Sequence, residues 1–183
     1  MKNALILHGT GNNHTGNWFP WLKKELEKKG YKVWVPDLPN SELANVKRYN
    51  KFIFKNKNFV FNKDTLIIGH SSGAVAILGL LQKFPDNLKV KKSILVASFM
   101  NDFGDPDFSG LFEEPFDFNK IKTKSEKIIF VHSDDDPYCP LSHAEYLSQK
   151  LDANLVIIKN QGHFNLEKGP EFKEFPAILD LID

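Results

Sequence analysis

Short apolar runs alternate with segments of helical spacing along most of the chain. We expect strands at the apolar runs 4–9, 31–39, 64–70, 90–98, 127–133 and 154–160. The spacing of apolar residues predicts helices at 17–29, 41–54, 72–84, 142–151 and 175–182. Strands that alternate with helices are typical of a parallel sheet covered on both faces. The pattern therefore predicts an α/β fold with a mostly parallel central sheet of about six strands.

The segment 99–126 does not follow this alternation. Between 99 and 120 it holds six phenylalanines and six carboxylates. A connection of this length is unusual between neighbouring elements of a compact domain. We expect an irregular excursion near the functional site that folds over one edge of the sheet.

Composition and charge limit the kind of protein that this chain forms. With 183 residues, 42% of them hydrophobic, it suits a single domain over 1–183. The net charge of +1 favours neither nucleic acid nor an anionic membrane as a partner. The apolar run 4–7 is too short for a signal peptide, and no run approaches the ~20 residues of a membrane span. These features, with Cys139 as the single cysteine, predict a full-length cytoplasmic protein.

The stretch IIGHSSGA, residues 67–74, places Ser71 between two glycines where a strand changes to a helix. A G-x-S-x-G turn of this kind strains the serine backbone and exposes the hydroxyl at the top of the sheet. The N–H of the next residue, Ser72, then opens the helix and points toward developing negative charge. Ser71 is therefore the predicted nucleophile. The alternatives are a turn whose glycines only permit packing, and Ser72 as the nucleophile.

A serine nucleophile needs an imidazole base and a carboxylate that orients it. On a fold of this kind they follow the serine, first the acid and then the histidine. His132 lies within a predicted strand, where we expect a packing role, and His143 lies in a predicted helix, where we expect exposure. His163 follows the last strand and is the predicted base. Three other histidines precede the serine: His8, His14 and His70.

The loop SDDDPYCP, residues 133–140, offers the carboxylate. Asp134, Asp135 and Asp136 directly follow a predicted strand, although three adjacent acids also suit a solvated turn. Pro137 fixes the backbone after Asp136, which favours Asp136, with Asp135 next. This loop, the serine turn and the histidine loop all leave the carboxyl ends of strands, where sites form in parallel sheets.

Together, these motifs resemble the α/β-hydrolase superfamily. They are similar to the small serine hydrolases that include retinoblastoma-binding protein 9 and its bacterial relatives, in the segments LILHGTG, PWLKKELEKKGYKVWVPDLP, IIGHSSGA, SDDDPYCP and QGHFN. The resemblance covers nearly the whole chain and implies a fold without a large cap domain. It also implies a triad of Ser71, Asp136 and His163, and it is the better reason for choosing Asp136 over Asp135.

The resemblance assigns the first loop as well. In H-G-x-G, the N–H of Thr10 is implied to bind the oxyanion together with that of Ser72, although HGTG also suits a flexible turn. Pocket-protein binding is not expected, because Cys139 lies in PYCPL and the L-x-C-x-E motif is absent. No nucleotide cofactor or metal is expected, because HGTGNN lacks the full G-x-G-x-x-G fingerprint and no histidine pair has ligand spacing.

The sequence thus predicts a serine hydrolase that forms an acyl-enzyme on Ser71. A small carboxylic ester is the expected substrate, with a short peptide or amide next. The alternatives are an interaction protein in which catalysis has lapsed, and a peptidase or acyltransferase that uses the same serine. Five aromatic residues either line an apolar acyl pocket or cover the core: Trp18, Phe19, Phe103, Phe108 and Phe112.

Overall fold

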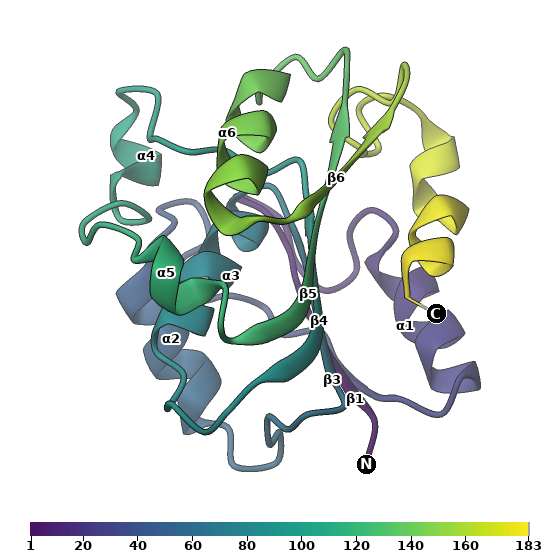
Figure 1. The fold of residues 1–183 in the computed structure, drawn as a ribbon. Coiled ribbons are helices and arrows are strands. Elements are labelled where there is room, and N and C mark those ends of the chain that lie inside the picture. The colour runs from purple at the N-terminus through teal and green to yellow at the C-terminus, as the bar shows by residue number, and fades with distance from the viewer. Residues whose placement is uncertain (183) are drawn as a thin grey trace.

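The protein forms a six-stranded sheet in a computed structural model that describes residues 1–182 (Figure 1). The strands are β1 (Asn3–Leu7), β2 (Lys32–Trp34), β3 (Thr65–His70), β4 (Val90–Val96), β5 (Ser125–Ser133) and β6 (Asn154–Ile158). Their order across the sheet is β2-β1-β3-β4-β5-β6, and every neighbouring pair is parallel. The predicted fold class is confirmed.

Helices cover both faces of the sheet (Figure 1). One face carries α1 (Phe19–Lys28) and two short 3₁₀ helices, η1 (Pro170–Lys173) and η2 (Pro176–Leu181). The other carries α2 (Val46–Lys55), α3 (Ser72–Gln82), α5 (Phe118–Ile121) and α6 (Leu141–Leu151), with α4 (Pro106–Ser109) at its margin. Successive side chains of β1 point to opposite faces of the sheet. Ala4 and Ile6 pack toward α1, whereas Leu5 and Leu7 pack toward α3. None of the helices within residues 1–182 has the length and apolar character needed to cross a bilayer.

Three predicted elements differ in extent. The strand expected at 31–39 pairs only over β2, because Pro36 and Pro39 have no N–H for the ladder. The helix expected from 41 begins at Val46, where the side chain of Asn45 accepts a hydrogen bond from the Arg48 N–H at 2.9 Å. The helix expected at 175–182 is the 3₁₀ helix η2, which Pro176 opens.

The segment 99–126 does not fold over an edge of the sheet, so that prediction was wrong. The edge strands are β2 and β6, whereas this segment joins the inner strands β4 and β5. It packs instead on the layer that contains α3, and its helix α5 contacts both α3 and α6. Phe99, Leu111 and Ile121 are buried in the same apolar cluster as the side chains of α3. The segment therefore extends the hydrophobic core and also borders the site.

Candidate active site

Ser71 occupies a strained backbone turn between β3 and α3. Its φ is 56° and its ψ is −127°, a conformation that residues other than glycine rarely adopt. The glycines on either side permit the turn, because a Cβ at Gly69 would lie 2.7 Å from the carbonyl oxygen of Gly73. The strain and the close packing match the strand-to-helix turn that exposes a nucleophilic serine.

Gly73 gives the first test of this turn. A Cβ at this position would lie 2.4 Å from the His8 carbonyl oxygen and 2.6 Å from that of Leu7, so only backbone movement could relieve the clash. We expect Gly73→Ala to lower the free energy of unfolding by about 3 kcal/mol or more, measured by urea denaturation. Gly16→Ala is the control, because the three atoms nearest to its Cβ would all belong to the flexible side-chain amide of Asn12. Equal stability of the two variants would contradict this account of the turn.

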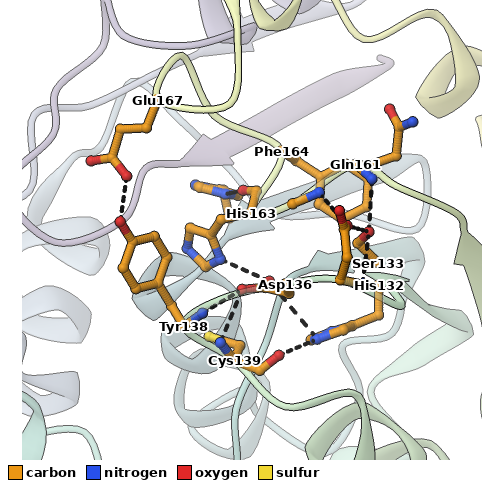
Figure 2. Close-up of polar contacts among 12 residues, drawn as sticks. His132, Ser133, Asp136, Tyr138, Cys139, Gln161, His163, Phe164 and Glu167 are labelled. Carbon is orange, nitrogen blue, oxygen red and sulfur yellow. Dashed lines mark hydrogen bonds and ion pairs between the residues drawn. The ribbon is translucent and has the colours of Figure 1, made fainter.

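Asp136 and His163 are brought together from two loops (Figure 2). His163 Nδ1 donates to Asp136 Oδ2 at 2.8 Å, and the Asp136 side chain is fully buried. The other carboxylate oxygen, Oδ1, accepts from the N–H groups of Tyr138 and Cys139 at 2.9 and 3.0 Å. Burial alone would raise the pKa of Asp136, but the hydrogen bond and charge of His163 and the two N–H donors lower it. Asp136 is therefore a buried carboxylate that fixes the imidazole with its proton on Nδ1.

The neighbouring acids hold the histidine loop in place. Asp135 Oδ1 accepts from the hydroxyl of Ser133 and the N–H of Gly162, each at 2.6 Å, and its Oδ2 accepts from Lys168 at 2.9 Å. These bonds lower the pKa of Asp135, and the bond from Ser133 has the largest effect. Asp134 accepts from the N–H of Asn160 at 2.9 Å. All three acids thus connect the loop after β5 to the loop after β6, and only Asp136 contacts the His163 ring.

The HGTG loop lies against the serine turn. A Cβ at Gly9 would be 3.0 Å from the Cβ of Ser71, and the Thr10 hydroxyl donates to the Ser72 hydroxyl at 2.8 Å. Within residues 1–182, neither the N–H of Thr10 nor that of Ser72 donates a hydrogen bond to another group of the chain. The two residues whose N–H groups are expected to bind an oxyanion are therefore in contact with each other next to Ser71.

His8 anchors this loop. Its buried ring donates from Nδ1 to the Gly9 carbonyl at 2.8 Å and accepts from the Leu38 N–H through Nε2 at 2.9 Å. Burial lowers the pKa of His8, which keeps the ring neutral and preserves both bonds. The order of the motifs along the chain excluded His8 as the base, and it gave no indication that His8 anchors the HGTG loop.

Three further histidines, His132, His143 and His14, contact other groups. His132 is fully buried, as expected for a packing residue, and its Nε2 donates to the Cys139 carbonyl at 2.8 Å. His143 was predicted to be exposed, which is wrong, because it is 7% exposed and stacks on Phe103 at 5.2 Å between ring centroids. His14 pairs with Asp37 on the surface at 2.8 Å.

A cavity of about 560 Å³ opens beside Ser71 and His163. Phe99, Phe103 and Phe108 line it, whereas Phe112 packs against the core. Trp18 and Phe19, expected in the pocket or the core, are fully buried in the core. The hydroxyl of Tyr138, on another wall of the cavity, donates to Glu167 at 2.6 Å (Figure 2). Glu167 is the only Asp, Glu, Lys or Arg among the described residues that line this cavity.

One group of side chains within residues 1–182 has atoms close enough to suggest a metal site. Ligand atoms of Asp136, Cys139 and His163 all lie within 4.8 Å of one another. However, burial and the charge of Asp136 raise the pKa of the Cys139 thiol, so the thiolate that metals bind is disfavoured. The other two residues are already bonded to each other. The arrangement suits proton transfer better than metal binding.

Comparisons with known proteins place this chain in a family. The chain matches the serine hydrolase family over residues 4–183. Serine hydrolase RBBP9 of Rattus norvegicus is 31% identical to this chain, and the match covers 96% of this chain and 92% of the rat protein. YdeN of Bacillus subtilis (strain 168) is 28% identical, over 99% of this chain and 94% of its own. The crystal structure of the B. subtilis ydeN gene product aligns with a TM-score of 0.91 at 26% identity, covering 100% of this chain and 97% of that one.

The chain therefore belongs to the serine hydrolase family and has the α/β-hydrolase fold. The resemblance expected from the sequence motifs is confirmed, and the described residues include no large cap over the sheet.

Proposed function

We propose that the protein hydrolyses small carboxylic esters through a triad of Ser71, His163 and Asp136. The observation that carries the proposal is the 2.8 Å bond from His163 to the buried Asp136, in a loop that borders the same cavity as the strained Ser71. With its proton held on Nδ1, the imidazole keeps Nε2 unprotonated and able to accept a proton from the serine.

The proposed reaction has two halves. In the first, Ser71 Oγ attacks the ester carbonyl carbon while its proton passes to His163 Nε2, and the departing alkoxide then takes that proton. In the second, water attacks the acyl-enzyme, His163 accepts the water proton, and Ser71 recovers it as the acid leaves. Each N–H donor of the oxyanion site, Thr10 and Ser72, is expected to stabilise the transition state by about 3–4 kcal/mol.

The cavity wall supports an apolar acyl group. Phe99 and Phe103 lie 5.2 Å apart between ring centroids, and Phe99 and Phe108 lie 5.3 Å apart. An apolar wall beside the serine would remove an alkyl or aromatic acyl chain from water. A neutral ester of a small apolar acid is therefore the substrate that these residues favour, ahead of a short peptide or amide.

Phe103→Ala tests the acyl wall. Because Phe103 is 43% exposed, we expect the variant to fold while its kcat/KM for p-nitrophenyl butyrate falls about tenfold relative to p-nitrophenyl acetate. Phe112→Ala is the matched control, from the same segment but outside the cavity. An unchanged acetate-to-butyrate ratio in Phe103→Ala, or an equal change in Phe112→Ala, would remove the acyl-wall assignment.

A second comparison tests the bond that is cleaved. Wild-type protein is expected to hydrolyse p-nitrophenyl butyrate and to leave the p-nitroanilide of the same acid largely intact. Preference for the anilide would instead indicate a peptidase. Acyl transfer to an added alcohol in preference to water would indicate an acyltransferase.

A further inference from the structure

His70, the last residue of β3, lies between the nucleophile turn and the histidine loop. It directly precedes Ser71 in the chain, yet its side chain points inward and is 3% exposed. The centroid of its ring lies 4.8 Å from that of His163. Trp18 and Phe19, from the start of α1, enclose the ring at 6.0 and 6.1 Å between centroids.

The His70 side chain also forms a hydrogen bond with the backbone of His163. His70 Nε2 lies 2.7 Å from the carbonyl oxygen of His163. Because a carbonyl oxygen only accepts, the proton of the His70 ring must be on Nε2. Burial, then the charge of His163, lowers the pKa of His70 to about 3, so the ring stays neutral in ordinary buffers.

The next carbonyl along the histidine loop is held in the same way. Trp18 Nε1 donates to the carbonyl oxygen of Phe164 at 3.0 Å. Phe164 has a φ of 52° and Gly162 a φ of 53°, so the backbone on both sides of His163 is left-handed. Two consecutive carbonyls of this strained turn thus point at donors in the interior. Loss of either donor would leave a buried acceptor without its partner.

We propose that His70 is a positioning residue for His163, and that with Trp18 it fixes the backbone that carries the catalytic imidazole. The inference rests on the proposed function. Asp136 holds the ring through Nδ1, whereas His70 holds the main chain of the same residue from a different strand. Because His70 and Ser71 are consecutive, the strand end that presents the nucleophile also sets the position of the base.

The test compares two amides at one position. Glutamine can place its amide nitrogen near the position of imidazole Nε2, whereas asparagine falls short. We expect His70→Asn to lower kcat for p-nitrophenyl butyrate by about 10- to 100-fold, because small displacements of a catalytic group have effects of this size. KM should stay within about twofold, because His70 borders the cavity with only 3% of its surface exposed and the phenylalanines that line the cavity are unchanged. His70→Gln should recover most of the lost kcat.

A control separates positioning from general stability. Asn50 donates to the Gly79 carbonyl at 3.1 Å, in a buried contact between α2 and α3. Asn50→Leu removes a side-chain-to-carbonyl bond of the same kind between residues that do not line the cavity, so it should lower stability in urea and leave kcat unchanged. If His70→Asn does not fold, Trp18→Phe removes the adjacent donor and should also lower kcat at constant KM.

Two results would overturn the inference while the proposed function stands. The first is a folded His70→Asn variant whose kcat equals that of an active wild type. If His70→Asn does not fold, the same result for a folded Trp18→Phe variant counts in its place. The other is an equal loss of kcat in Asn50→Leu. A folded wild type that neither hydrolyses the ester nor reacts with a fluorophosphonate would remove the proposed function, and this inference with it.

Discussion

Ser71→Ala is expected to reduce ester hydrolysis to background, with a loss in kcat of about 10⁶-fold. The variant removes the hydroxyl of the strained residue, whose φ is 56°, and leaves the other residues that line the cavity unchanged. His163 then has no serine proton to accept, and no acyl-enzyme can form. Initial rates with p-nitrophenyl butyrate, corrected for hydrolysis without enzyme, measure the effect.

Ser72→Ala is the matched control for this prediction. The Ser72 hydroxyl accepts from the Thr10 hydroxyl at 2.8 Å, but the proposed role of Ser72 belongs to its backbone N–H, which the variant retains. We therefore expect a far smaller loss than in Ser71→Ala. If Ser72→Ala abolished hydrolysis while Ser71→Ala retained it, the nucleophile would be Ser72.

Asp136→Asn is expected to lower kcat by about 10⁴-fold with the fold intact. The two N–H groups of Tyr138 and Cys139 require an acceptor at Oδ1, so the amide nitrogen must occupy the position of Oδ2. There it faces His163 Nδ1 and donates to it, which moves the imidazole proton to Nε2. An imidazole protonated on Nε2 cannot accept the serine proton. Steady-state or stopped-flow rates with the ester measure the activity, and circular dichroism of the same sample shows whether the variant is folded.

Asp135→Asn discriminates between the two candidate acids. Asp135 binds Ser133, Gly162 and Lys168 and does not contact the His163 ring. The variant should therefore weaken the attachment of the histidine loop and cause a smaller loss of kcat than Asp136→Asn. The opposite order would transfer the orienting role to Asp135.

The arrangement of the fold could be predicted because its signals are local. Continuous apolar runs such as 64–70 and 127–133 mark strands that are buried on both faces, and helical spacing between them marks the crossovers. The prolines at 36 and 39, which end β2 early, are also visible in the sequence. The path of 99–126 could not be predicted, because its phenylalanines pack against α3, a helix distant in the chain.

The site could be predicted only in part, for the same reason. Motif order favoured Ser71 and His163 as candidates, but the choice among three adjacent acids depends on a loop 27 residues further along the chain. His143 was misplaced because Phe103, from the unpredicted segment, covers it. The bond of His70 depends on where a carbonyl of the histidine loop points, and residue identity does not encode that direction.

Intact mass after exposure to a fluorophosphonate, for wild type and Ser71→Ala, shows whether Ser71 is an activated nucleophile. Such a reagent modifies a serine only where a neighbouring base activates it. We expect a single adduct on the wild type and none on Ser71→Ala. A folded wild type that remains unmodified, or an adduct that persists on Ser71→Ala, would contradict this prediction.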